Sequence, residues 1–190
     1  PHRYPTVVGS VYGRLPLTFE QNLGQSSDQV DFLARGGGYT LFLTPAEAVF
    51  ALRQPGATLG SVLRLNLVNA NPAPAAVGEN KQAGISNYFI GNDPAKWLTN
   101  IPHYKRVRYA SLYNGVDLVY YGNRQGKLEY DLEVAAGADP GKIAFSYQGA
   151  TPSLNAKGQL VFALASGELI QKAPLIYQRE TFARRIVPGE

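Results

Sequence analysis

Hydrophobic and polar side chains alternate along residues 114–136, NGVDLVYYGNRQGKLEYDLEVAA. In the second half of this stretch, every second residue from Leu128 to Val134 is apolar, and the residues between them are charged. Successive side chains of a β-strand point to opposite sides of the sheet, so a period of two predicts a strand with one buried face. Two such strands joined by a polar turn that contains glycine form an antiparallel hairpin.

The same alternation recurs along most of the chain. Three glycines at 36–38 predict a hairpin turn, and Asp93 predicts a cap for a single helical turn over 94–96 that Trp97 closes. The Pro/Ala/Gly-rich stretch 71–84 predicts an irregular excursion that marks a seam between two sub-sheets. Further strands are predicted at 30–35, 39–44, 47–53, 62–69, 87–90, 104–109, 142–147, 159–164, 168–171, 175–178 and 181–187.

Short strands with turn signals every ~8–12 residues are typical of a sandwich or a barrel. We therefore predict an all-β fold, an antiparallel β-sandwich with either one core or two sub-sheets sharing a core, and one or two short helical turns. Residues 1–14 are expected to form a leader, and residues 15–190 the β-sandwich domain. Inside the leader, Thr6 to Tyr12 (TVVGSVY) has strong strand character.

Composition supports a folded β protein and narrows its partners. Hydrophobic residues make up 45% and charged residues only 17% of the 190 residues, which argues against disorder. The formal net charge of +4 is scattered, so we expect no nucleic-acid partner; the basic groups fit solvated strand faces or an anionic partner such as a polysaccharide. No apolar run approaches the ~20 residues that span a bilayer.

Cysteine is absent, which rules out disulfides and thiolate metal sites. The chain begins at Pro1, which fits either removal of a secretory signal peptide or a trimmed end. We expect no cofactor, no metal and no catalytic residue, because nucleophile, metal and nucleotide signatures are missing. His2 and His103 are the only histidines, and neither has an acidic cluster or a G-x-S-x-G elbow beside it.

Carboxylates offer the strongest hint of chemistry. Glu129, Asp131 and Glu133 form a row with neighbours ~7 Å apart, a spacing compatible with glycoside hydrolysis or a metal, although a solvated strand face looks the same. Asp117 shares a strand face with Val119 and Tyr121, so burial would require a partner, for which Arg106 and Arg108 are the candidates.

One aromatic group offers a binding surface. Trp97 has Tyr88, Phe89 and Tyr104 near it in the sequence, and this group predicts either an aromatic platform for sugar rings or a plug at the edge of the core.

Six segments carry a family resemblance. They are, in order, 15–25 (LPLTFEQNLGQ), 30–36 (VDFLARG), 39–45 (YTLFLTP), 86–94 (SNYFIGNDP), 115–122 (GVDLVYYG) and 174–178 (PLIYQ). Together they resemble the N-terminal domain that precedes SBBP-type β-propeller repeats in large secreted bacterial proteins. The resemblance implies an extracellular, all-β protein without an assigned activity, so it supplies no catalytic residue.

Two departures from that family suggest self-assembly. Family members continue past the Tyr-Gln segment into further strands and propeller repeats, whereas this chain ends at Glu190 and carries the Thr6–Tyr12 strand ahead of the matching region. A sandwich without its last strand offers an open edge, which the spare strand of an identical subunit could fill, and head-to-tail repetition gives a filament. The residues of this donor strand are Val7 and Val11 on one face and Val8 and Tyr12 on the other.

Three functions remain open from the sequence. The first is a non-catalytic, secreted structural or assembly module at the bacterial cell surface, either filament-forming by strand exchange or attached to β-propeller repeats. The second is a carbohydrate-binding or adhesion module that uses Trp97 and nearby tyrosines. The third is a glycoside hydrolase that uses Glu129, Asp131 or Asp117.

Overall fold

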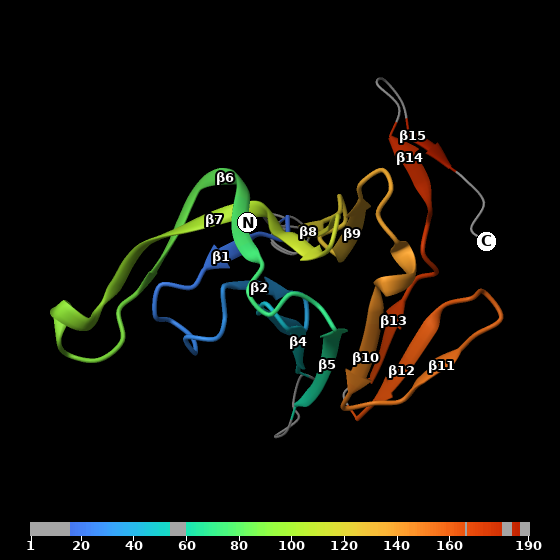
Figure 1. Cartoon of the computed structure of the whole chain (residues 1–190). Coiled ribbons are helices and arrows are strands. Elements are labelled where there is room, and N and C mark those ends of the chain that lie inside the picture. The colour runs from blue at the N-terminus through green and yellow to red at the C-terminus, as the bar shows by residue number, and fades with distance from the viewer. Residues whose placement is uncertain (1–15, 54–59, 166, 180–183, 187–190) are drawn as a thin grey trace, which may run out of the picture.

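The computed structural model describes residues 16–53, 60–165, 167–179 and 184–186, and their regular structure is almost entirely antiparallel β (Figure 1). The predicted all-β fold is therefore confirmed. The strands are β1 Phe19–Gln21, β2 Phe32–Gly36, β3 Tyr39–Leu43, β4 Glu47–Leu52, β5 Ser61–Val68, β6 Ala75–Tyr88, β7 Leu98–Tyr113, β8 Val116–Gly122, β9 Leu128–Val134, β10 Ala144–Gln148, β11 Pro152–Leu154, β12 Leu160–Leu164, β13 Gly167–Gln171, β14 Tyr177–Arg179 and β15 Arg184–Ile186. Two single 3₁₀ turns are η2 Pro94–Lys96 and η3 Pro140–Lys142.

The long strand β7 organises a ten-stranded sheet. Tyr104 pairs with Lys81 of β6 and with Phe19 of β1, and Val107 pairs with Gly78 of β6 and with Tyr120 of β8. Because β6 lies along one edge of β7, β1 and β8 must lie end to end along the other edge. The sheet therefore divides at β7 into a branch β1-β2-β3-β4-β5-β10 and a branch β8-β9.

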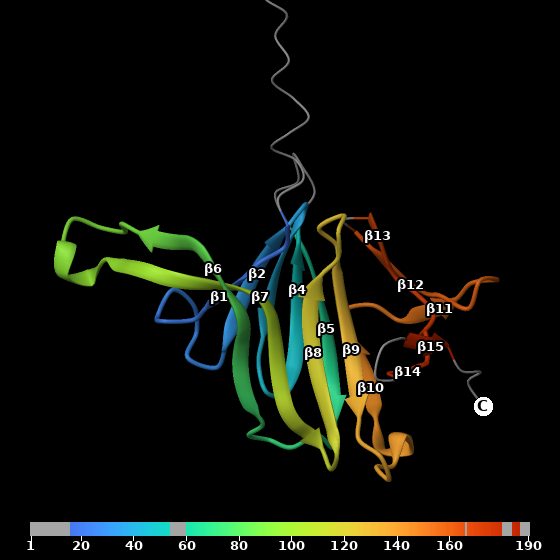
Figure 2. The same ribbon diagram turned by 90° about the horizontal axis from the view of Figure 1, so that it is seen from above.

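The two branches curl toward each other around one core (Figure 2). Phe19, Leu41 and Leu43 of the first branch and Tyr109 and Leu118 from β7 and β8 belong to the same buried cluster. At the far ends, Tyr130 of β9 meets Phe145 of β10 edge-to-face, with ring centroids 6.0 Å apart. The two layers of the predicted sandwich are thus parts of one continuous sheet.

A three-stranded sheet, β11-β12-β13, lies beside the seam between β9 and β10. The fully buried Phe162 of β12 packs on Tyr147 of β10, with ring centroids 4.7 Å apart. The Gln171 side chain donates to the Tyr130 hydroxyl and accepts from the Tyr147 hydroxyl, each at 2.8 Å. The Gln171 side-chain amide therefore bridges the two ends of the curled sheet. Among the described residues, β9 and β10 have no backbone pairing with each other.

Local turn chemistry fixes the predicted hairpins. Gly38 has φ 90°, which only glycine adopts readily, and it lets β2 pair with β3 from Phe32–Leu43 to Gly36–Tyr39. The central hairpin β8–β9 also forms as predicted. The cap of η2 is confirmed too, because the Asp93 carboxylate accepts from the Ala95 amide at 3.1 Å.

The prediction for 71–84 is wrong. Most of this stretch is β6, which continues to Tyr88, and β7 is longer than the predicted 104–109. Alanine, glycine and asparagine have low strand propensity, but backbone pairing along β7 overrides it. The short strands β1 and β11 were not predicted. Beyond β1, the β6–β7 pair continues as a projecting arm, residues 85–101, with η2 at its tip (Figure 1).

Candidate functional site

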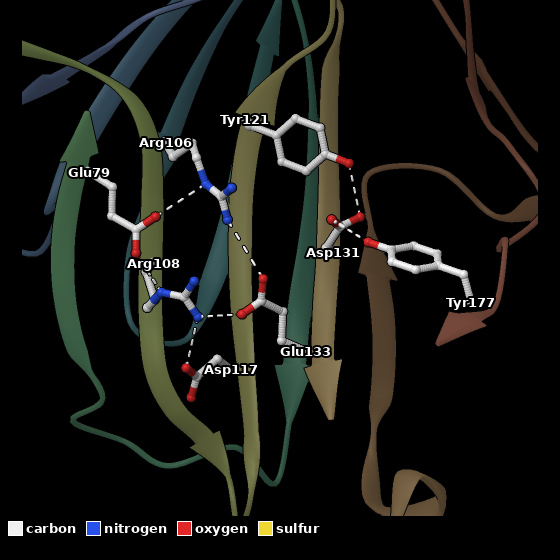
Figure 3. A network of polar contacts seen from close by, with 8 residues as sticks. All are labelled: Glu79, Arg106, Arg108, Asp117, Tyr121, Asp131, Glu133 and Tyr177. Atoms are coloured by element: carbon white, nitrogen blue, oxygen red, sulfur yellow. Dashed lines mark hydrogen bonds and ion pairs between the residues drawn. The ribbon is translucent and has the colours of Figure 1, made fainter. Parts of the chain in front are cut away.

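The outer face of β6, β7, β8 and β9 carries an ion-pair network (Figure 3). Arg108 donates to Glu79 at 2.6 Å, to Glu133 at 2.7 Å and to Asp117 at 2.9 Å. Arg106 is ion-paired with Glu79 at 3.2 Å and with Glu133 at 3.7 Å. Register alone brings these side chains together, because Glu79 lies opposite Arg106 and Asp117 opposite Glu133. The predicted partner of Asp117 is therefore confirmed as Arg108.

The network is half-buried and shields an apolar side chain. Its five side chains retain 22–33% exposure. Val119 lies between Arg108 and Asp131 in register on this outer face, yet it is fully buried. The hydrogen bonds that Arg108 donates to Glu133 and then to Glu79 hold the pKa of its guanidinium above the ordinary value. The network therefore shields Val119 from solvent and stabilises the pairing of the four strands β6, β7, β8 and β9.

Each carboxylate of the acidic row has a protein partner. Glu129 accepts from the Asn123 amide at 2.8 Å, and Glu133 accepts from Arg108. Asp131 accepts from Tyr121 at 2.9 Å and from Tyr177 of β14 at 2.8 Å, which ties the β14–β15 hairpin to the outer face. Burial, and then these contacts with Asp131, raise the pKa of Tyr121. Within the described residues, no cluster of three or more histidine, aspartate and glutamate side chains is arranged to hold a metal ion.

A second polar cluster surrounds Glu20 of β1. Its carboxylate, in a residue only 7% exposed, accepts from Arg35 of β2 and from the Tyr88 hydroxyl of β6. The Arg35 guanidinium also lies over the Tyr88 ring, 5.7 Å from the ring centroid. Burial, and then the Glu20 contact, raise the pKa of Tyr88. The cluster links β1, β2 and β6 at the base of the arm.

His103 lies opposite Glu20 in the β1–β7 pairing, and each of its ring nitrogens is within hydrogen-bond distance of a hydroxyl group. Its Nε2 lies 2.7 Å from the Ser86 hydroxyl and its Nδ1 lies 3.0 Å from the Thr18 hydroxyl. A serine–histidine contact of this length is the first half of a catalytic triad, but the third group here is a hydroxyl and not the carboxylate that stabilises an imidazolium. No local sequence pattern points to Ser86 or Glu20, because their partners lie at distant positions in the chain.

The residues predicted as an aromatic platform lie in three environments. Tyr104 packs against the core, edge-to-face with Phe32. The Tyr88 hydroxyl donates a hydrogen bond to the Glu20 carboxylate. Trp97 lies at the tip of the arm, 36% exposed, where it packs edge-to-face on Phe89 and donates to the Gly91 carbonyl at 3.1 Å. Trp97 and Phe89, with the 74%-exposed Ile90, form an apolar tip that is open to a ligand or a partner.

Two shallow hollows complete the described surface features. The first, of about 300 Å³, lies between Ala76 of β6 and the β1–β2 loop, and its lining includes Asp28 and Asp31. The second, of about 610 Å³, is lined by residues that include Asn69 and Ser111. The predicted donor-strand residues Val7, Val8, Val11 and Tyr12 lie outside the described residues.

These features define an antiparallel all-β domain in which the charged side chains of the outer face form ion pairs with one another. The chain belongs to the family described as Domain of unknown function (DUF7948), whose model matches residues 19–190. No curated protein and no solved structure matches it. None of the helices in the described part of the chain has the length and apolar character needed to traverse a lipid bilayer.

Proposed function

We propose that this chain is a non-catalytic structural and assembly module of a secreted bacterial protein. The observation that carries the proposal is the internal pairing of the outer face. The charged side chains of this face form ion pairs with one another across four strands. They are Glu79, Arg106, Arg108, Asp117 and Glu133. A catalytic or metal site needs at least one group whose bonding capacity is directed at a ligand, whereas a scaffold needs strands that stay together.

The sequence resemblance adds the biological setting. Domains of the resembling type precede β-propeller repeats in large secreted proteins, which favours an extracellular module that joins repeats, copies of itself, or both. In its sharper form, the proposal is that Thr6–Tyr12 of one copy adds as a strand to another copy, so that the protein polymerises. Strand addition supplies main-chain hydrogen bonds without any reactive pocket.

Light scattering of the purified chain, followed by negative-stain imaging, tests this proposal. We expect the full chain to form polymers and a variant lacking residues 1–12 to stay monomeric with an unchanged unfolding midpoint. A matched control keeps those residues but replaces Arg124, an exposed residue of the β8–β9 turn, with Ala. Equal assembly with and without residues 1–12 would reject strand exchange, and a full chain that stays monomeric would reject self-assembly altogether.

The exposed tip of the arm favours carbohydrate binding as a second candidate function. Trp97 and Phe89 offer two aromatic rings at the far end of a projecting hairpin, where a polysaccharide has free access. A glycan screen with the wild-type protein and Trp97→Ala separates this function from the first. Wild-type binding that Trp97→Ala abolishes would support it, and a wild-type protein that binds no glycan would discard it.

A further inference from the structure

The outer edge of β6 has no strand beside it among the described residues. From Ala75 to Lys81, β6 keeps a single register with β7, and its other edge faces away from the sheet. Roughly every second residue of such a strand directs its N–H and C=O groups outward, which makes an open edge a template for another strand. The regular stretch ends at Asn80, whose φ is 57°, and the register then shifts between Lys81 and Ile85.

Other edges are less suited to accept a strand. The edges of β9 and β10 face each other and are bridged by Gln171. The other edge strands are shorter than β6, because β11, β14 and β15 have three residues each and β13 has five. The edge of β6 is the longest of these edges, and its outward-facing Val77 is 48% exposed.

The surroundings of this edge match the composition of residues 1–12. Ala76 borders the 300 Å³ hollow, whose lining is mainly polar and includes Asp28 and Asp31. Residues 1–12 contain His2 and Arg3 and no acidic residue, followed by the apolar alternation of Thr6–Tyr12. The basic end of an added strand would find opposite charge at this hollow.

We propose that the edge of β6 from Ala75 to Glu79 is the acceptor for the Thr6–Tyr12 strand of a second copy of this chain. The proposal rests on the proposed assembly function and names the surface that performs it. The acceptor stretch, bounded by Asn80, is long enough for the central residues Val7–Val11 of the donor. The distortion at Asn80 also limits each edge to one short donor, as bulges do on protected edges.

Cross-linking between single-cysteine variants tests the acceptor, because the chain has no cysteine of its own. The full-length Val8→Cys variant is mixed with full-length Val77→Cys and treated with a short bismaleimide. The matched control mixes Val8→Cys with Val62→Cys, since Val62 on β5 is equally exposed, at 47% against 48%, and lies mid-sheet between β4 and β10. We expect several-fold more cross-linked heterodimer with Val77→Cys. Ala75→Cys, on the same face of β6, serves as a second acceptor variant if Val77→Cys lowers the unfolding midpoint.

The outcomes separate this proposal from the assembly function. Polymers that cross-link no better at Val77 or Ala75 than at Val62 would refute the acceptor edge and leave assembly intact. A chain that neither polymerises nor cross-links would refute both. Cross-linking of a Val8→Cys/Val77→Cys double variant within a monomer would also overturn the proposal, because the donor would then belong to the same copy.

Discussion

Replacing Arg108 with methionine removes the centre of the outer-face network while keeping a side chain of similar length. The guanidinium forms charge-assisted hydrogen bonds with Glu79, Asp117 and Glu133. After the replacement, Glu79 and Glu133 keep Arg106 as a partner, but Asp117 loses its ion pair and keeps the Ser111 amide. One cation, Arg106, then remains beside three carboxylates and is paired with two of them, so the repulsion between the carboxylates is less well compensated.

The magnitude follows from the degree of burial. Breaking a fully buried ion pair costs about 3–5 kcal/mol, whereas an exposed pair contributes about 0–1 kcal/mol. The Arg108 side chain is 22% exposed and its three partners are 27–33% exposed, so the network lies between these limits. We expect Arg108→Met to lower the free energy of unfolding by about 2 kcal/mol, a change of about thirtyfold in the equilibrium constant.

Urea unfolding followed by far-ultraviolet circular dichroism measures this loss. Tryptophan fluorescence is a poor probe here, since Trp97 lies at the tip of the arm and reports on the arm and not on the sheet. Arg124→Met, in the exposed β8–β9 turn, is the matched control and should change stability by less than about 0.5 kcal/mol. A loss for Arg108→Met as small as that of the control would refute the view that the network clamps the four strands.

Three further predictions address burial, pH and chemistry. Phe162→Ala should cost about 3–5 kcal/mol in urea unfolding, since the ring is fully buried, while Leu154→Ala, at a position 72% exposed, should change little; equal losses would show that the small sheet does not pack as described. Burial raises the pKa of Asp31, so the stability linked to its proton is present below the unfolded pKa near 3.9 and is lost as pH rises through the folded pKa. Asp31→Asn should therefore raise the unfolding midpoint at pH 7 and lose that advantage below about pH 4; a variant less stable at pH 7 would contradict the sign. Ser86 should not react with a fluorophosphonate probe, because the Nδ1 of His103 faces Thr18 and not a carboxylate; labelling that Ser86→Ala abolishes would reveal a nucleophile.

Local patterns made part of this fold predictable. The hairpins β2–β3 and β8–β9 follow from alternation and turn glycines, which act within a few residues of each other. The pairing of Asp117 with Arg108 was also predictable, because period two placed the carboxylate on a face that needed a partner.

Non-local pairing made the rest unpredictable. The strand β6 consists largely of residues with weak strand propensity and forms because β7 lies beside it. The sharing of one β7 edge by β1 and β8, and hence the curl of the sheet, depends on contacts between distant parts of the chain. The contact of Ser86 with His103 likewise arises from the β6–β7 pairing and has no sequence signal of its own.

Hydrogen–deuterium exchange of the unmodified full chain at increasing protein concentration tests the central claim, assembly through an open sheet edge, most directly. We expect the amides of Ala75–Glu79 to become more protected as concentration rises, while the amides of the interior strand β4 keep the same exchange rates. Rates at Ala75–Glu79 that do not change while light scattering reports growing polymers would contradict it.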